Sequence, residues 1–241
     1  MNWSQFFTSA VGKKITMALS GIFLILFLIV HAGLNACIWA NDGGVMFNKA
    51  AHFMGANVVP RVLEIGLFVF FLIHIIQGLV LEIQNRSKRG KGYAVKMGNR
   101  GSAWNSRAMG ILGALVLIFL AVHLSDFWYP SRFGGLTNMY IDTATNQIVP
   151  AGTLGGKEYH DLYGEMLHQF TSYPWIIILY EVGVIALFWH LVHGFQSSFR
   201  TLGLTNHKYI GLIKGTGIVY SVIICLAFML MPLSFYFGWI Q

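Results

Sequence analysis

Long apolar stretches alternate with short polar segments along this chain. Five of the apolar stretches can cross a bilayer as helices, because each offers roughly 20 residues or more for a hydrocarbon core of about 30 Å. The pattern therefore predicts an all-α integral membrane bundle of five transmembrane helices, at about residues 15–39, 58–83, 109–128, 175–199 and 209–231. The first stretch lacks a small-residue cleavage site, so we expect a permanent span there and not a signal peptide.

The composition agrees with a membrane protein, since 56% of the residues are hydrophobic and only 10% are charged. We expect residues 1–241 to form one transmembrane domain. Two of the longer connections each contain a candidate short interfacial helix, at 47–56 and at 159–170. Between Trp128 and Gly156 the chain is rich in Gly, Thr, Asn and Pro, which predicts irregular structure.

The distribution of basic residues predicts the orientation of the chain. Twelve of the 16 Lys and Arg residues lie in the N-terminal segment, in the connection 86–107, and in the connection between the fourth and fifth spans together with the start of the fifth span, which contains Lys214. The positive-inside tendency then places the N-terminus in the cytoplasm and the C-terminus outside. The two candidate interfacial helices fall on the outer side. The net charge of +7 is explained by this topology, so it does not indicate nucleic-acid binding.

Four histidines lie inside the first four apolar stretches, one in each: His31, His74, His123 and His190. Ionisable side chains inside a bilayer are costly and are usually kept for a function. We interpret this set as two pairs of axial ligands to haem iron.

The depth of each histidine in its helix separates the four into two pairs. His31 lies 17 residues after Lys14, and His123 lies 16 residues after Arg107, which places both about 25 Å from the inner surface at 1.5 Å per residue. His74 precedes the inner residue Arg86 by 12 residues, and His190 precedes Arg200 by 10, which gives about 15 to 18 Å. We therefore expect His31 to pair with His123 and His74 to pair with His190, with two haems stacked across the membrane.

The pattern H-x-x-x-G supports the second pair, because it occurs at both His74 to Gly78 and His190 to Gly194. A glycine one turn away on the same face leaves room for the edge of a macrocycle. Glycine at this spacing is also a common device for close packing of membrane helices. His193 lies three residues after His190 and is an alternative fourth ligand, or a contact for a haem propionate.

The cysteines limit how a haem would be held. Cys37 and Cys225 are isolated and the chain has no C-x-x-C-H motif, so any haem is expected to be b-type, held by axial ligation and packing alone. A zinc site is less expected, because the histidines are spread over four helices without a cysteine or carboxylate cluster beside them.

The first span carries a motif that resembles a known family. The run Ser9-Ala-Val-Gly-Lys-Lys-Ile-Thr-Met-Ala-Leu-Ser-Gly21, followed by His31-x-x-x-Asn35, is similar to the first helix of the five-helix, di-haem cytochrome b subunits of succinate:quinone oxidoreductases and fumarate reductases. This resemblance implies that His31 and His123 bind the distal haem and that His74 and His190 bind the proximal haem.

The resemblance also implies partners and a location. A flavoprotein subunit and an iron-sulfur subunit would dock on the cytoplasmic face of a bacterial inner membrane. This chain would pass electrons between their clusters and a membrane quinone, with menaquinone favoured over ubiquinone. Succinate or fumarate chemistry would reside in a partner subunit.

Quinone chemistry needs protons, so acidic residues near the bilayer are candidates for proton transfer. Glu64 lies near the outer end of the second span, and Glu181 lies deeper, in the fourth. A hydrogen bond to a neighbouring helix is an equally reasonable role for either.

Two other functional classes remain open from the sequence. The first is the di-haem cytochrome b subunit of another respiratory complex, such as a hydrogenase or formate dehydrogenase. The second is a transporter without redox chemistry, whose intramembrane histidines relay protons. A haem spectrum and the identity of the partner subunit distinguish these classes.

Overall fold

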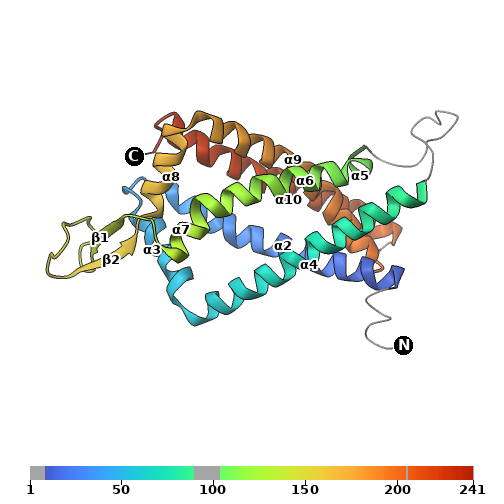
Figure 1. Cartoon of the computed structure of the whole chain (residues 1–241), viewed down its shortest axis with the longest axis horizontal. Helices are drawn as coiled ribbons and strands as arrows, with labels where there is room; N and C mark the ends of the chain where they lie inside the picture. The colour runs from blue at the N-terminus through green and yellow to red at the C-terminus, as the bar shows by residue number, and fades with distance from the viewer. Residues whose placement is uncertain (1–8, 90–103, 205, 241) are drawn as a thin grey trace. The chain divides into compact units, whose positions relative to one another are not determined.

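The computed structural model describes residues 9–89, 104–204 and 206–240. It is mainly helical, and Figure 1 shows the order of its elements. The elements are α2 (Ala10–Asn35), η1 (Ala36–Ala40), α3 (Val45–Ala56), α4 (Val58–Arg89), α5 (Trp104–Arg107), α6 (Met109–His123), η2 (Leu124–Trp128), α7 (Tyr129–Phe133), β1 (Asn138–Asp142), β2 (Gly156–His160), α8 (Leu162–Ser172), α9 (Pro174–Thr201) and α10 (His207–Tyr236).

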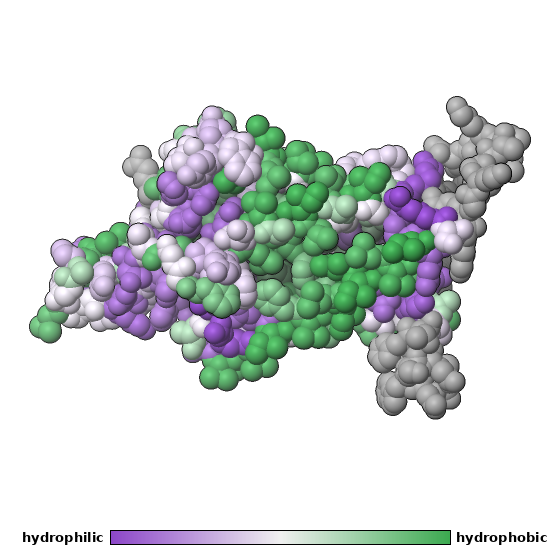
Figure 2. Space-filling model, in the orientation of Figure 1, coloured by the Kyte–Doolittle hydropathy of each residue, from purple (hydrophilic) through white to green (hydrophobic). Residues whose placement is uncertain are grey.

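The five predicted spans are confirmed as long apolar helical segments. Within the described residues, five segments are long and apolar enough to cross a membrane, and they cover Ala10–Ala40, Val58–Ser87, Met109–Phe133, Pro174–Thr201 and Lys208–Tyr236. Many of their large hydrophobic side chains are exposed, for example Val58 at 76%, Ile65 at 67% and Leu212 at 68%. Figure 2 shows hydrophobic residues over the visible faces of these helices, as expected for surfaces that contact lipid chains.

The two predicted short helices also form. Helix α3 covers the segment expected at 47–56, and α8 begins three residues later than the segment expected at 159–170. Asp161 caps α8, because its carboxylate accepts a hydrogen bond from the backbone N–H of Gly164 at 2.9 Å. The position of both helices at the outer interface stays a prediction.

The expectation of irregular structure between Trp128 and Gly156, and of an all-α chain, was wrong in part. Strands β1 and β2 pair in antiparallel register, with Met139 opposite Tyr159 and Ile141 opposite Lys157. Ile141 is fully buried in a small apolar cluster with Val45 and Tyr159. The short run of Met, Tyr and Ile is what forms β1, and it was hidden by the Gly, Thr, Asn and Pro residues around it.

A tight turn follows β1. The carboxylate of Asp142 accepts hydrogen bonds from the backbone N–H groups of Thr145 and Ala144 at 2.8 and 2.9 Å, and from the Thr145 hydroxyl at 3.1 Å. These donors, the Thr145 backbone first, hold the pKa of Asp142 below its ordinary value.

The chain forms two compact units. The first consists of Met1–Leu28, Ile65–Val116 and Ile185–Ile223, and the second of Ile29–Glu64, Leu117–Val184 and Ile224–Gln241. Each unit therefore contains segments from all five long helices. Of the basic residues used to predict the orientation, Lys91, Lys96 and Arg100 lie outside the described residues.

The core of the second unit joins α3 and α8 to the ends of the long helices. Asn48 is fully buried and connects the short helices, since its amide nitrogen donates to Asp161 at 2.8 Å and its amide oxygen accepts from the backbone N–H of Tyr163 at 3.0 Å. Gly44 lies against the Tyr163 ring with a φ of 85°, and a Cβ there would stand only 2.3 Å from a ring carbon. Both the backbone conformation and the close approach therefore require glycine.

Candidate functional site

The four intramembrane histidines meet in two pairs. The ring centroids of His31 on α2 and His123 on α6 are 5.7 Å apart, with an interplanar angle of 89°. Those of His74 on α4 and His190 on α9 are 6.1 Å apart, with an angle of 67°. His31 and His123 both belong to the second compact unit, and His74 and His190 both belong to the first. The pairing is the one expected from depth along the helices.

The distance between the two ring centroids in each pair can be compared with the distance expected when two imidazoles bind one metal ion from opposite sides. A bond of about 2 Å from metal to ring nitrogen, added to a ring radius of about 1.1 Å on each side, places the two centroids about 6 Å apart. The separations of 5.7 and 6.1 Å fit this requirement. All four histidines are half-buried, so each keeps part of its surface uncovered by neighbouring side chains. The donor set therefore fits axial ligation of a haem iron by two imidazoles at each pair.

Ser20 fixes the proton position on His74. Its hydroxyl lies 3.1 Å from the carbonyl oxygen of Met17 and 3.2 Å from Nδ1 of His74. The Ser20 hydroxyl donates its single hydrogen to the Met17 carbonyl oxygen, and its oxygen is then left to accept from Nδ1–H of His74. The lone pair of the neutral His74 ring is then on Nε2, which is the nitrogen left for a metal. Ser20 is only 1% exposed, so water does not compete for this bond.

The His190 ring, which pairs with His74, has a different environment. Nδ1 of His190 is buried and has no hydrogen-bond partner among the described residues. Two glycines face the two rings: a Cβ on Gly21 would lie 3.6 Å from Cε1 of His74, and one on Gly113 would lie 3.8 Å from Cε1 of His190. The absence of side chains at these positions leaves space beside both rings.

The first-span histidine is held by its own helix and by an aromatic neighbour. The Asn35 amide nitrogen donates to the carbonyl oxygen of His31 at 2.9 Å and lies 3.4 Å from its Nδ1. An amide nitrogen only donates, so a hydrogen bond here would need the lone pair of the ring on Nδ1, but a contact of 3.4 Å is too long to decide the tautomer. The ring of Phe228 packs 5.7 Å from the His31 ring, centroid to centroid. Asn35 therefore restrains the position of the ring without fixing its tautomer.

His123 lies in an aromatic enclosure. Phe119, Phe127 and Tyr180 surround its ring at centroid distances of 5.7, 5.5 and 6.0 Å. The Tyr180 hydroxyl lies 3.5 Å from Nδ1 of His123 and donates to Asp126 at 3.3 Å. A glycine at position 183 allows this close packing, because a Cβ there would stand 2.6 Å from Phe119. These aromatic neighbours cover part of the His123 ring.

The remaining histidines do not join either pair within the described part of the chain. His193 is half-buried, three residues after His190, and the ring in contact with His74 is that of His190. His52 packs edge-on against Tyr159 at 5.0 Å, and its pKa is lowered by partial burial and by the nearby Lys157 and His160. His168 contacts the Ser172 hydroxyl on its own helix.

The glycines of the H-x-x-x-G pattern are not the ones nearest the rings. A Cβ on Gly78 would lie 3.4 Å from Cε of Met17, which is ordinary helix packing, and Gly194 has open space beside it. Gly21 and Gly113 occupy the positions beside His74 and His190 instead. The two glycines of the pattern therefore do not make the space beside these rings, and the glycines that face the rings belong to α2 and α6.

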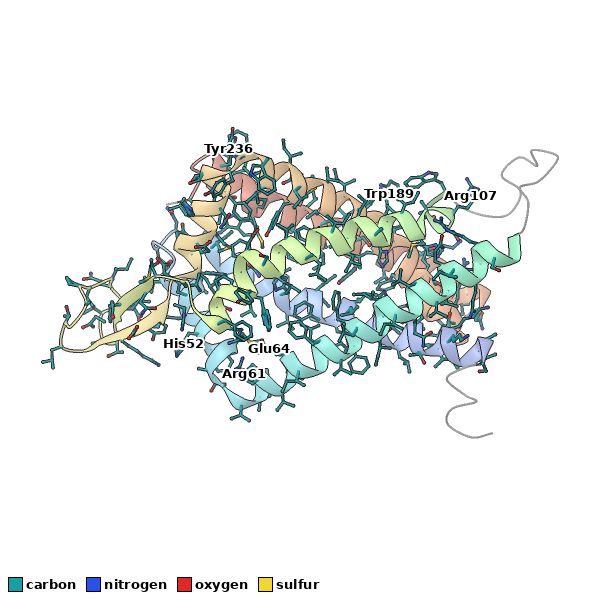
Figure 3. All side chains as sticks on the ribbon, in the orientation of Figure 1. His52, Arg61, Glu64, Arg107, Trp189 and Tyr236 are labelled. Atoms are coloured by element: carbon teal, nitrogen blue, oxygen red, sulfur yellow. The ribbon has the colours of Figure 1, made fainter. Side chains whose placement is uncertain are left out.

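Glu64 is held by a set of hydrogen-bond donors at the start of α4. Arg132 on α7 donates to both carboxylate oxygens at 3.0 Å, Trp128 donates to one of them at 2.7 Å, and Arg61 donates to the other at 3.0 Å. Figure 3 shows Arg61 and Glu64 next to each other on α4. Because the Glu64 side chain is only 17% exposed and faces two cations, this arrangement favours a fixed carboxylate that joins α4 to α7.

Glu181 has a contrasting environment. It lies on α9, and its Oε1 atom is buried without a hydrogen-bond partner in the described residues. Glu82 instead forms an ion pair with Arg86 one turn along α4, at 2.6 Å. Of the acidic residues in α4 and α9, Glu181 is therefore the one with an unused buried oxygen.

Three site residues were missed from the sequence: Ser20, Tyr180 and Asp126. Ser20 is part of the first-span motif from Ser9 to Gly21, and Asp126 follows His123 by three residues, so both lay close to positions already singled out. Tyr180 comes from a different helix, and its approach to His123 is a tertiary contact without a local signal. Among the described residues, no three His, Cys, Asp or Glu side chains gather in a group that could hold a metal ion.

Comparison with known proteins finds a relative among respiratory enzymes. The chain is 26% identical over 188 residues to the succinate dehydrogenase cytochrome b558 subunit of Bacillus subtilis, and the alignment covers 77% of this chain and 74% of that protein. No family model matches the sequence. No solved structure matches it either.

Proposed function

We propose that this chain is the cytochrome b membrane subunit of a succinate dehydrogenase or fumarate reductase. In this role it carries electrons between iron-sulfur clusters of a partner subunit and a quinone in the membrane. The observation that carries the proposal is the presence of two histidine pairs, on four different apolar helices, with centroid separations of 5.7 and 6.1 Å. The similarity to the cytochrome b558 subunit supports the same assignment.

Two b-type haems would be held by these residues, the distal one by His31 and His123 and the proximal one by His74 and His190. A bound haem supplies a one-electron carrier, and ligation by two imidazoles leaves no coordination position for oxygen or substrate. The chain itself orients the ligands. Ser20 would set the tautomer of His74 through a hydrogen bond of 3.2 Å, and the aromatic residues around His123 would hold its ring in place.

The proposed orientation follows from the basic residues, with the N-terminus in the cytoplasm and the C-terminus outside. Flavoprotein and iron-sulfur subunits would dock on the cytoplasmic face, where Lys14 and Arg200 end two of the spans. The helices α3 and α8 would then lie at the outer interface. Menaquinone is the proposed quinone, and a bacterial inner membrane is the proposed location.

Protons for quinone chemistry are proposed to pass through Glu181 in preference to Glu64. The buried Oε1 atom of Glu181 has no partner among the described residues and can accept a proton. Glu64 already accepts from Arg61, Arg132 and Trp128, so protonation there would break charge-assisted bonds.

The direct test is a haem count by optical spectroscopy on the purified complex and on single substitutions. The wild-type chain should hold two low-spin b haems. Alanine at each of the four ligand positions, His31, His74, His123 and His190, should remove one haem. His193→Ala is the matched control, because it removes an imidazole from the same helix as His190 and should keep both haems.

Two outcomes contradict the proposal. A colourless wild-type protein would favour a transporter without redox chemistry. Loss of a haem in His193→Ala, with both kept in His190→Ala, would show that the fourth ligand is misassigned. Co-purification with a flavin-bearing subunit supports the assignment to succinate dehydrogenase or fumarate reductase, whereas a molybdenum or nickel subunit would assign the chain to another respiratory complex.

A further inference from the structure

Tyr180 links one proposed haem ligand to a carboxylate. Its hydroxyl lies 3.5 Å from Nδ1 of His123 and 3.3 Å from Oδ2 of Asp126. The residue is only 6% exposed, and its ring packs edge-on against Phe119 and Phe170 at centroid distances of 5.0 and 5.2 Å. The aromatic neighbours therefore fix where the hydroxyl lies, so its two contacts are set by packing.

Counting hydrogens gives the direction of both contacts. A phenol has one hydrogen, and Tyr180 donates it to the Asp126 carboxylate. The phenol oxygen then presents only lone pairs to His123, so a favourable contact requires the proton on Nδ1 of that ring. The lone pair of the neutral imidazole is consequently on Nε2. Both distances are longer than those of ordinary hydrogen bonds, so each contact is weak and acts mainly through its direction.

The local backbone brings Asp126 to this position. Helix α6 ends at His123, and the next turn, η2 (Leu124–Trp128), is a π-helix. The wider turn rotates the residues that follow His123 around the helix axis, and single π-turns are frequent at functional sites. Asp126 lies in the middle of this turn, on the side of the Tyr180 hydroxyl. The π-helical turn that carries Asp126 and the buried phenol of Tyr180 thus both lie next to His123.

We propose that Tyr180 and Asp126 form a positioning relay for His123. Tyr180 selects the tautomer and holds the ring, while Asp126 orients the phenol and increases the electron density that the imidazole presents to iron. The inference rests on the proposed function, since it presupposes that His123 binds a haem. It goes beyond that function by assigning roles to two residues outside the ligand set. The equivalent contact of His74 is the neutral hydroxyl of Ser20, whose hydrogen goes to the Met17 carbonyl oxygen.

The test uses Tyr180→Phe and Asp126→Asn in the assembled complex. The readouts are the haem count, the midpoint potential of each haem and the electron paramagnetic resonance signal of the oxidised haems. Both variants should keep two haems. Tyr180→Phe should shift the reduction equilibrium of the haem held by His31 and His123 three- to tenfold toward the reduced state, where tenfold corresponds to about 59 mV for one electron. The other haem should not change.

The double variant distinguishes a relay from two independent electrostatic effects. If Asp126 acts through the phenol, Asp126→Asn should shift the same haem in the same direction, and adding it to Tyr180→Phe should produce no further shift. Tyr163→Phe is the matched control, because Tyr163 belongs to the same apolar cluster, is 4% exposed and has a buried hydroxyl. It should leave both potentials and both signals unchanged.

The outcomes separate this inference from the proposed function. A wild-type complex that lacks the haem at His123 rejects the proposed function itself. Two haems with unchanged potential and unchanged resonance signal in Tyr180→Phe reject the relay alone, and so do additive shifts in the double variant. If Tyr180→Phe loses the haem, Asp126→Asn decides, because its amide oxygen still accepts the phenol hydrogen. An unshifted haem in Asp126→Asn then rejects the relay.

Discussion

Replacement of Ser20 by alanine removes the one hydrogen bond that sets the tautomer of His74. Ser20 is 1% exposed, and its oxygen accepts from Nδ1 of His74 at 3.2 Å. Alanine leaves the imidazole N–H without this acceptor, and no water replaces it easily in so buried a position. In the proposed haem site the ring would then donate less electron density to iron, which would destabilise the oxidised haem relative to the reduced haem. The midpoint potential of that haem should rise.

The size of the shift follows from the strength of the bond. A neutral hydrogen bond contributes about 0.5 to 1.5 kcal/mol. If about 1 kcal/mol of this is specific to the oxidised state, the potential rises by about 40 mV, since a tenfold change in the equilibrium constant corresponds to about 59 mV for one electron. The haem count should remain two, because His74 itself is retained.

A redox titration monitored by optical absorbance measures this shift, and the haem at His31 and His123 serves as an internal reference. Ser221→Ala is a matched control, because Ser221 is also fully buried but donates to the Gly217 carbonyl oxygen of its own helix at 2.7 Å. It should leave both potentials unchanged. A shift of less than about 10 mV in Ser20→Ala, or a downward shift, would refute the assigned tautomer.

Three other predictions concern the second unit. Asn48→Ala should lower the free energy of unfolding by about 2 to 4 kcal/mol in a denaturant titration followed by circular dichroism, because it leaves the buried backbone N–H of Tyr163 without a partner. Glu64→Gln should lower the unfolding temperature through its weakened bonds to Arg132, while quinone-linked turnover keeps its pH profile. The pKa of Asp142 is lower in the folded turn than its ordinary value, so the ionised carboxylate stabilises the turn at any pH above that ordinary pKa. This stabilisation is lost as the pH falls through the lower pKa of the folded state. The backbone amides of the turn should therefore exchange hydrogen faster only in acid.

Each of these predictions has an outcome that contradicts it. For the first, a loss of less than about 0.5 kcal/mol would show that the buried amide carries little of the connection between α3 and α8, and Asn57→Ala, at an exposed position, is the control. A slowed turnover with a changed pH profile in Glu64→Gln would make Glu64 a proton carrier. Equal amide exchange rates in wild type and Asp142→Asn at neutral pH would show that the Asp142 carboxylate does not stabilise the turn.

The spans and the histidine pairing were accessible from the sequence because both depend on one-dimensional regularities. Hydropathy over about 20 residues is enough to locate a membrane helix. A constant rise per residue is enough to compare the depths of His31 and His123 from the basic residues at the helix ends. Neither step needs knowledge of which helices are neighbours.

The contacts that support the ligands were not accessible in this way. Tyr180 approaches His123 across 57 residues of sequence, and Glu64 meets Arg132 across 68. Such contacts depend on helix rotation, which hydropathy leaves open when a helix is apolar on most sides. The hairpin was missed for a different reason, since five-residue strands such as β1 are too short for a periodic signal amid turn-forming residues.

The order in which the two histidine pairs are completed along the chain has a consequence for biogenesis. The chain has supplied both imidazoles of the first pair once His123 has been synthesised, whereas His74 must wait for His190 on α9. At about 5 to 20 residues per second, the ribosome separates these events by several seconds. Tyr180 also emerges after His123, so the earlier pair gathers its ligands before the phenol that supports one of them exists. A nascent chain arrested after α7 would therefore contain both histidines of the first pair but only His74 of the second, and under the proposed function haem insertion would begin at the pair formed by His31 and His123.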